Sequence, residues 1–390
     1  MSRQVVSRDS HAKSRGKFLI GTNSRGIGGG GSDSDILFSS QAIDELQSSL
    51  LAWYEQNRRD LPWRRTKNPY KIWISEVMLQ QTRVAVVEER YRAFLRDFPT
   101  VEALANASEA DVLTQWSGLG YYRRARMLHM AAKAVVESFG GKMPATATEL
   151  RALPGIGAYT SAAVASIAFG EPVAVVDGNV ERVVQRLAGW RSDSSSGQAE
   201  LARKTNQMAN ALLDPARAGD FNQAMMELGA TVCLPRNPRC LTCPLRPECK
   251  TQGEHPVQVR ARMRSENAGY ALVIRSSNTN REILLDQRGP HHTVMPGLWE
   301  LPSLRKYEVA GDHLRMTLRH SIMQVNYYVR IRTVFEEDAE ALTVPSDIRR
   351  WIRLHDLAAL PLTGLARKVL LRAKLPEFTS KPQLARSTAD

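Results

Sequence analysis

Leu153-Pro154-Gly155-Ile156-Gly157 is the stretch that decides how the first part of this chain folds. It separates a short capped helix, predicted over Thr148 to Ala152, from a nearly all-apolar helix, predicted over Tyr159 to Phe169. Gly155 and Gly157 flank an aliphatic residue, so the chain can turn sharply there and leave backbone amides open where the second helix begins. Open amides at a helix N-terminus suit a phosphate group. On its own, however, a Pro-Gly-x-Gly segment is more often a simple turn.

An aspartate follows at the end of an apolar run, Val173 to Val176. This run delivers Asp177 to the start of a helix predicted from near Val180. Asp in such a place is most often a turn or capping residue, because its carboxylate accepts hydrogen bonds from nearby backbone amides. Asp177 is therefore a candidate cap as well as a candidate functional group.

All the cysteines of the chain lie within one short segment. They follow the spacing C-x6-C-x2-C-x5-C, which gathers four thiolates around one point. Four thiolates are the ligand set of a 4Fe–4S cluster or of structural zinc. We favour one 4Fe–4S cluster, because four-cysteine zinc sites more often combine two C-x2-C pairs, and a chain of this length does not need disulfides packed into one loop. The candidate ligands are Cys233, Cys240, Cys243 and Cys249, interleaved with the cations Arg236, Arg239, Arg246 and Lys250.

The charge balance of the whole chain is strongly basic. Lysine and arginine number 53 against 40 aspartate and glutamate residues, which gives a net charge of +13 at pH 7. Such a field attracts polyanions, and nucleic acid is the commonest of these. A chain of 390 residues, 43% of them hydrophobic, is long enough for two domains. No stretch approaches the apolar length of a membrane span, so no membrane partner is expected.

The chain opens with a tail and a helical domain. Residues 1–37 are rich in Ser, Arg and Gly and indicate a disordered basic tail. Residues 38–249 have a helical pattern almost throughout, with helix N-caps predicted at Ser108 and Thr146. The fold class is therefore mainly α in this part.

The pattern changes after the cysteines. A polar, basic linker is predicted over 250–268, and an alternating pattern then predicts a smaller α+β domain over 269–375, followed by a second tail over 376–390. Strands are predicted at Tyr270–Ile274, Glu282–Leu285 and Val325–Ile331.

Together these features resemble the helix-hairpin-helix DNA glycosylase superfamily with an iron–sulfur loop, here residues 233–249. Within it the chain is most similar to the adenine DNA glycosylases of the MutY type, and Gly297 to Pro302 resembles part of their Nudix-like C-terminal domain. The other segments that carry the resemblance are Leu61 to Arg64, Trp73 to Thr82, Gly118 to Tyr122, Asp177 to Val180 and Phe221 to Gly229.

The resemblance implies a function in base-excision repair. Members of this family hydrolyse the N-glycosidic bond of adenine mispaired with 8-oxoguanine or guanine, after flipping the base out of double-stranded DNA. We therefore expect double-stranded DNA with such mispairs as the partner. We also expect a monomer that acts on the nucleoid in a bacterial cytoplasm.

Glu76 is the candidate general acid. Adenine is a poor leaving group, so it must be protonated as the glycosidic bond breaks, by a carboxylic acid that still holds its proton near neutral pH. On a helix, Ile72, Trp73 and Leu79 share a face with Glu76, and burial of that face raises the pKa of the carboxyl group. Without the resemblance, an exposed helical glutamate is the usual interpretation.

The resemblance also implies roles for three other residues. Asp177 stabilises the positively charged sugar that the departing base leaves, as in glycoside hydrolysis. Asn179 orients the site, and Tyr159 assists the carboxylates by hydrogen bonding. Endonuclease III-like relatives carry a lysine nucleophile in place of Tyr159, so we predict a glycosylase without strand-cleaving activity. The rival interpretations are a bifunctional enzyme of that kind, acting on oxidised pyrimidines, and a non-catalytic DNA-damage binder.

DNA contacts follow from the same resemblance. Gln81 and Tyr121 match residues that wedge into the stack beside the flipped base; core packing is the alternative interpretation of Tyr121. Arg64 matches a residue near the adenine pocket. Family members read 8-oxoguanine with a Phe-Ser-His loop, where this chain has Ile322-Met323-Gln324. With Met323 in place of serine, we expect one hydrogen bond fewer to the oxidised base.

Overall fold

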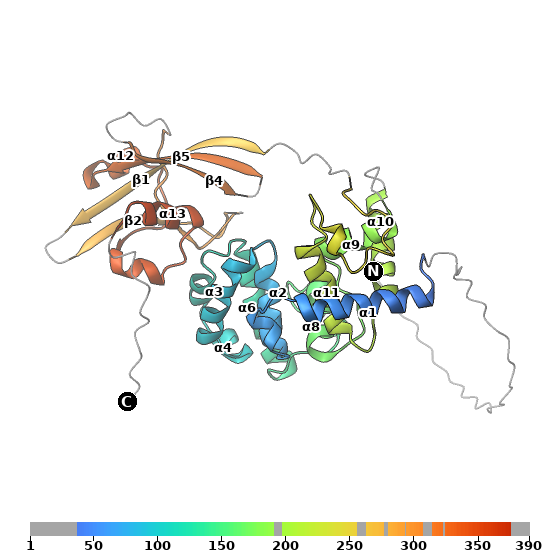
Figure 1. The fold of residues 1–390 in the computed structure, drawn as a ribbon. Coiled ribbons are helices and arrows are strands. Elements are labelled where there is room, and N and C mark those ends of the chain that lie inside the picture. The colour runs from blue at the N-terminus through green and yellow to red at the C-terminus, as the bar shows by residue number, and fades with distance from the viewer. Residues whose placement is uncertain are drawn as a thin grey trace, which may run out of the picture. The chain divides into compact units, whose positions relative to one another are not determined.

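The structure is a computed structural model that describes residues 37–190, 197–255, 263–276, 280–292, 294–306, 314–322 and 324–375. Helices make up the part before the cysteine loop, and strands with short helices make up the part after it (Figure 1). None of the helices in the described ranges combines the length and apolarity needed to cross a membrane.

In the described ranges the helical part contains α1 to α11 and the 3-10 turns η2 and η4. Their bounds are α1 Ser40–Asn57, η2 Pro62–Arg65, α2 Pro69–Leu79, α3 Val84–Asp97, α4 Val101–Asn106, α5 Glu109–Gln115, α6 Arg123–Phe139, α7 Ala147–Arg151, α8 Ala158–Phe169, α9 Gly178–Ala188, α10 Gln198–Leu212, α11 Ala218–Thr231 and η4 Cys240–Thr242.

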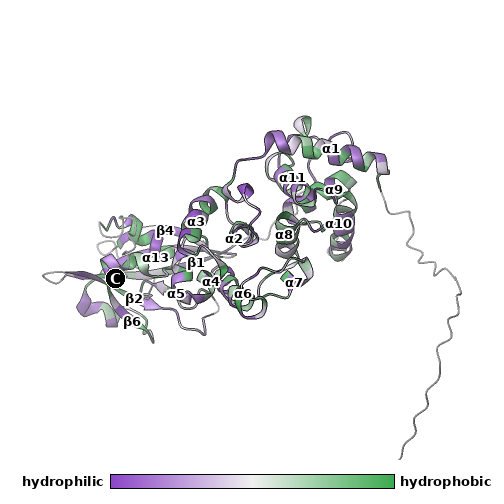
Figure 2. Cartoon of the chain, turned by 90° about the horizontal axis from the view of Figure 1, so that it is seen from below, coloured by the Kyte–Doolittle hydropathy of each residue, from purple (hydrophilic) through white to green (hydrophobic). Residues whose placement is uncertain are grey.

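Two hydrophobic cores hold these helices together. The first is built largely by α2 to α6 and α8, with Trp73, Phe94 and Trp116 among its fully buried side chains. The second is built by α1, α9, α10 and α11 around Tyr54 and Phe221. Hydrophilic and hydrophobic residues alternate along α1 (Figure 2), as expected of a helix that buries one face. Because α8 packs against both α2 and α11, it joins the two cores.

The predicted hairpin between α7 and α8 is confirmed. Gly155 has a φ of +72°, and a Cβ atom built on it lies 2.4 Å from the Cβ of Met127, so only glycine fits there. Gly157 is the N-cap of α8 and has no side chain to occupy the first amides of the helix. The turn therefore presents the N-terminus of α8 with its amides open.

The sheet of the C-terminal part is mixed. Its strands run in the order β3-β2-β1-β5-β4, with β6 paired to β2; β1 and β5 are parallel and the other pairs are antiparallel. Leu272 packs with α13 on one face, whereas Ala271 and Val273 pack with α12 on the other. The bounds are β1 Arg264–Ser276, β2 Arg281–Gln287, β3 Trp299–Glu300, β4 Leu314–Ile322, β5 Val325–Val334, η6 Glu336–Asp338, α12 Ala339–Leu342, β6 Arg349–Arg353, η7 Leu354–Ala359 and α13 Gly364–Arg372.

Most predicted elements are confirmed. The hydroxyls of Ser108 and Thr146 accept hydrogen bonds from the backbone amides three residues on, and at Thr146 the side chain of Glu149 completes a capping box. The three predicted strands lie within β1, β2 and β5. The predicted tails fall outside the described residues, apart from Leu37, and so does Met323.

The end of the predicted linker is misplaced. The pattern assigned residues up to 268 to the linker, but β1 already begins at Arg264. Residues 264–268 pair in register with Val325–Val329 of β5. Their polar side chains gave no alternating signal, and the partner strand that supplies their hydrogen bonds lies far away in the sequence.

Candidate active site

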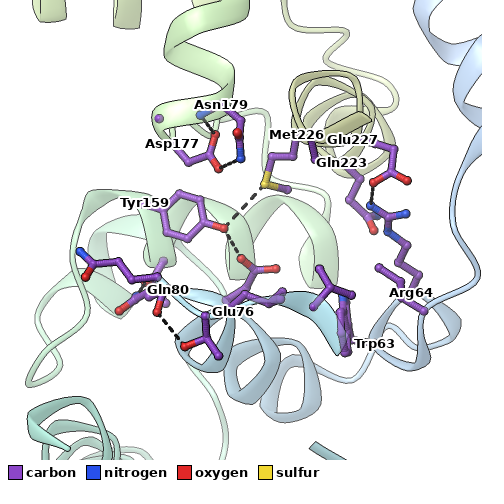
Figure 3. A pocket seen from close by; sticks show the side chains of 18 of the residues that line it. Trp63, Arg64, Glu76, Gln80, Tyr159, Asp177, Asn179, Gln223, Met226 and Glu227 are labelled. Carbon is purple, nitrogen blue, oxygen red and sulfur yellow. Dashed lines mark hydrogen bonds and ion pairs between the residues drawn. The ribbon is translucent and has the colours of Figure 1, made fainter. Parts of the chain in front are cut away.

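A cavity of about 740 Å³ opens between helices that build the two cores (Figure 3). Its walls come from the η2 segment, α2, the hairpin with the start of α8, the first residues of α9, and α11. The predicted site residues that line it are Arg64, Glu76, Gln81, Gly155, Gly157, Tyr159, Asp177 and Asn179.

Glu76 lines the cavity from α2 and is only 5% exposed. Ile72 and Trp73, one turn earlier on α2, are buried with it, as the helical pattern predicted. Burial raises the pKa of Glu76 to about 7; a hydrogen bond from Tyr159 opposes the rise and the charge of Asp177 adds to it. The carboxyl group therefore keeps its proton to a much higher pH than an ordinary glutamate does.

Tyr159 connects α8 to the carboxyl group on α2. Its hydroxyl donates a hydrogen bond to Oε2 of Glu76 and lies 3.7 Å from Sδ of Met226 on α11. Burial, and then the charge of Glu76, raise the pKa of Tyr159 well above its ordinary value. Tyr159 therefore stays neutral and remains a hydrogen-bond donor.

Asp177 is the N-cap of α9 and also faces the cavity. Its Oδ1 accepts hydrogen bonds from the backbone amides of Asn179 (2.8 Å) and Val180 (2.7 Å), and its Oδ2 accepts one from Nδ2 of Asn179 (3.0 Å). The capping interpretation is confirmed, and the cap fixes a carboxylate at the wall of the cavity, which is where the predicted role needs it.

Asn179 is held in turn by a residue that the sequence did not single out. Nη2 of Arg182 donates to Oδ1 of Asn179 (3.0 Å) and to the carbonyl of Gly229 (2.8 Å), and its Nε donates to the carbonyl of Cys233 (2.9 Å). Oδ1 of Asn179 is thereby occupied, so its amide nitrogen faces Asp177. A Cβ atom on Gly229 would lie 2.7 Å from Cβ of Asn179, so α11 approaches this closely only with glycine.

A third carboxylate at the cavity, Glu227, was also missed as a site residue. Its side chain is fully buried, and it receives hydrogen bonds from Arg59 (2.7 Å) and Arg64 (2.8 Å) at the cavity wall. Burial alone would raise the pKa of Glu227, but the two guanidinium groups outweigh it and lower the pKa to about 2. Glu227 lies in a segment that carried the resemblance, but only the fold brings Arg59 and Arg64 to it.

Tyr121 faces a second groove beside the cavity. This groove is lined by Gln81, Tyr121 and Gly155, so the hairpin and both predicted wedge residues border one surface. Tyr121 is 52% exposed, which excludes the alternative that it is a core residue. Gln81 and Tyr121 both have positive φ, of 55° and 48°.

The cysteines meet around one small pocket. All four thiols line it together with Arg186, whose Nη1 donates to Sγ of Cys233 at 3.4 Å. Burial, and then the charges of the neighbouring cysteines, raise the pKa of Cys243 to about 11. None of the four is in a disulfide. Across the described ranges, no group of three or more His, Cys, Asp or Glu side chains is arranged to hold a metal ion.

Comparison with known proteins identifies the family. Residues 74–207 match the model of the HhH-GPD superfamily base excision DNA repair protein. The adenine DNA glycosylase of Rattus norvegicus is 35% identical over 376 residues, which cover 83% of this chain and 72% of the rat protein. The chain belongs to the adenine DNA glycosylase family.

Other family members show the same likeness over shorter spans. The human adenine DNA glycosylase is 48% identical over 219 residues, covering 54% of this chain and 40% of the human protein. That of Mycolicibacterium smegmatis is 46% identical over 198 residues, covering 50% of this chain and 66% of the mycobacterial protein. The alignment with the human protein thus spans less than half of that protein's length.

The raised pKa of Glu76 predicts a pH-dependent cost to stability. An unfolded glutamate loses its proton near pH 4.5, whereas Glu76 in the folded protein keeps it to about 7. The stability that Glu76 contributes is therefore complete below pH 4.5 and is lost as the pH rises to 7. The Glu76→Gln variant avoids this loss, so it should gain stability at pH 8 relative to the wild type, by at most about 3 kcal/mol.

Urea unfolding at pH 5 and pH 8 measures the effect. Glu137→Gln, an exposed position on α6, is the matched control and should leave stability unchanged at both pH values. An equal change for Glu76→Gln at pH 5 and pH 8 would contradict the assigned pKa.

Proposed function

We propose that this chain is a monofunctional adenine DNA glycosylase, which hydrolyses the N-glycosidic bond of adenine mispaired with 8-oxoguanine or guanine in duplex DNA. The observation that carries the proposal is that Glu76 and Asp177 line one cavity in different environments. Glu76 is buried with a pKa of about 7, and Asp177 is held by three hydrogen bonds from backbone and side-chain N–H groups. Pairs of carboxyl groups in such contrasting environments divide into an acid and a charge stabiliser.

The chemistry follows from this division. Glu76 donates its proton to a ring nitrogen of adenine as the bond between the sugar C1′ and the base breaks, and the bonding electrons leave with the neutral base. Asp177 stabilises the positive charge that develops on the sugar. Glu76, now ionised, takes a proton from a water molecule whose oxygen attacks C1′, and the acid is regenerated. Tyr159 holds the carboxyl group in position through both steps.

The opposite wall of the cavity suits the heterocycle. Glu227 is an ionised acceptor, Arg64 is a donor, and Gln223 offers both kinds of group. Adenine presents an amino donor beside a ring acceptor, which matches an acceptor and a donor side by side. Trp63 adds an aromatic side chain to the same wall.

DNA binding is assigned to the open amides of the hairpin and to the wedge residues. Gly155 and Gly157 leave room for a phosphate at the N-terminus of α8, where the helix dipole favours an anion. Gln81 and Tyr121 border the adjoining groove. There Gln81 can occupy the place that the flipped base leaves in the stack, and Tyr121 can lie beside the partner base. The net charge of +13 supplies the long-range attraction. We expect the chain to act as a monomer.

The absence of a lysine nucleophile distinguishes this proposal from the bifunctional alternative. Tyr159 lies beside Glu76 in the cavity and offers a hydroxyl rather than an amine. Since no Schiff base can form there, strand scission should need added alkali.

We propose that Cys233, Cys240, Cys243 and Cys249 hold one 4Fe–4S cluster. Four half-buried thiols that line one small pocket, with a guanidinium donor at one sulfur, fit a group of thiolate-bound irons. The four cysteines would hold the cluster, and these bonds would then cross-link the loop from Cys233 to Cys249 and order its arginines. The loop also joins the site, because Arg182 connects the carbonyl of Cys233 to Asn179.

Glu76→Gln should abolish adenine release while leaving mispair binding largely intact. The substitution removes proton transfer and water activation but keeps the size of the side chain, so the single-turnover rate should fall about 100- to 10,000-fold. The measurement is incubation with a duplex containing A:8-oxoguanine, with and without hot alkali, alongside a fluorescence binding titration. Glu137→Gln, an exposed position on α6, is again the control.

A Glu76→Gln variant that keeps more than a tenth of the rate would remove Glu76 from its role. If the wild-type protein cuts the DNA strand without added alkali, or acts on a thymine-glycol duplex instead, the bifunctional alternative is favoured. No release of any base by the wild type would favour the non-catalytic binder.

Protein purified without oxygen should be yellow-brown and contain about four irons per chain. Cys240→Ser should lower the iron content and weaken DNA binding, because the loop that carries Arg236 and Arg246 loses its order. Metal analysis together with absorbance spectroscopy checks both expectations. One zinc ion and no iron in the fresh protein would refute the cluster.

A further inference from the structure

The guanidinium group of Arg124, near the start of α6, is surrounded by backbone carbonyls rather than by carboxylates. Its Nη1 donates to the carbonyls of Val77 (2.7 Å), Met78 (3.1 Å) and Gln80 (2.6 Å). Each of these groups belongs to the end of α2 or to the residue that follows it. Arg124 thus closes the C-terminus of the helix that carries Glu76, where a cation is favoured.

The other nitrogen reaches a different loop. Nη2 of Arg124 donates to the carbonyls of Leu119 (3.0 Å) and Gly120 (3.2 Å), and to Oγ1 of Thr82 (3.2 Å). The guanidinium carbon also lies 5.5 Å from the ring centre of Tyr121 and 5.4 Å from that of Trp116. One planar group therefore connects the loop after α2 to the loop before α6.

Both loops hold a non-glycine residue in a conformation that such residues rarely adopt. Gln81 has a φ of 55° and Tyr121 a φ of 48°. Conformations of this kind persist only where the surrounding structure determines them. Gln80 and Gly120, which precede Gln81 and Tyr121 in the chain, are among the residues whose carbonyls accept from Arg124.

The side chain of Arg124 is half-buried, so its guanidinium group depends on the carbonyl groups around it. Burial lowers the pKa of Arg124 to about 10, and the nearby Tyr121 counteracts this shift. The side chain nevertheless stays charged at neutral pH. Carbonyl dipoles and aromatic ring faces therefore balance its positive charge. In return, Arg124 holds the loops that carry these groups in place.

We propose that Arg124 is a positioning residue that fixes the Gln81 loop and the Tyr121 loop relative to each other, so that the two side chains enter DNA as one unit. This inference rests on the proposed function, which assigns Gln81 and Tyr121 to the DNA groove. Arginine suits this role because its two terminal nitrogens reach separate sets of acceptors, one on each loop, whereas the donors of lysine all lie on one nitrogen.

A double-mutant cycle tests the inference. Gln81→Ala, Tyr121→Ala and the combined variant are prepared with Arg124 present and again with Arg124→Met. The measured quantities are the binding affinity for a duplex with A:8-oxoguanine and the fluorescence of 2-aminopurine beside the adenine, which reports base flipping. With Arg124 present, the combined loss should be at least about fivefold smaller than the product of the single losses, as for coupled neighbours. With Arg124→Met, the losses should multiply.

Arg124→Lys is the second variant, because it keeps the charge if Arg124→Met fails to fold. It should show the same loss of coupling. Lys133→Met, an exposed position on the same helix, is the control and should leave the coupling unchanged. Coupling that survives in both Arg124 variants would overturn the inference. A wild type that releases no adenine would overturn the proposed function instead, and the binding cycle would still decide the role of Arg124.

Discussion

The site depends on one constraint, which is that a carboxyl group on α2 is buried beneath α8. Removing Glu76 from water is what keeps a proton on it near neutral pH. Tyr159 satisfies this carboxyl group without supplying a positive charge, since its own pKa is raised and it stays neutral. A lysine or arginine in its place would hold Glu76 ionised and remove the acid.

The same cavity holds a second buried glutamate whose pKa is shifted in the opposite direction. Glu227 is as inaccessible as Glu76, yet its pKa is about 2, because Arg59 and Arg64 donate to it directly. Burial alone does not determine the protonation state; the partner that burial brings does. The fold thus provides a proton donor and a permanent anion on two walls of one cavity. That combination suits a reaction in which a base is both protonated and recognised.

The sequence was sufficient to predict those features of the site that depend on residues close together in the chain. The apolar face around Glu76, the capping position of Asp177 and the hairpin at Gly155 were all predicted from sequence, and the structure places them around one cavity. The residues that were missed depend on distant partners. Glu227 and Arg59 lie 168 positions apart, and Arg182 meets the carbonyl of Cys233 across 51. No periodicity or composition reveals such pairs, and the misplaced start of β1 has the same cause.

The central claim is that burial makes Glu76 an acid that is still protonated near neutral pH, and its titration tests this most directly. The protein labelled with carbon-13 at the glutamate side-chain carboxyl groups can be followed by NMR from pH 4 to pH 9. The resonance of Glu76 is the one missing from the Glu76→Gln spectrum. The account predicts a midpoint near 7 for this resonance. A midpoint near 4.5, the ordinary value for glutamate, would contradict it.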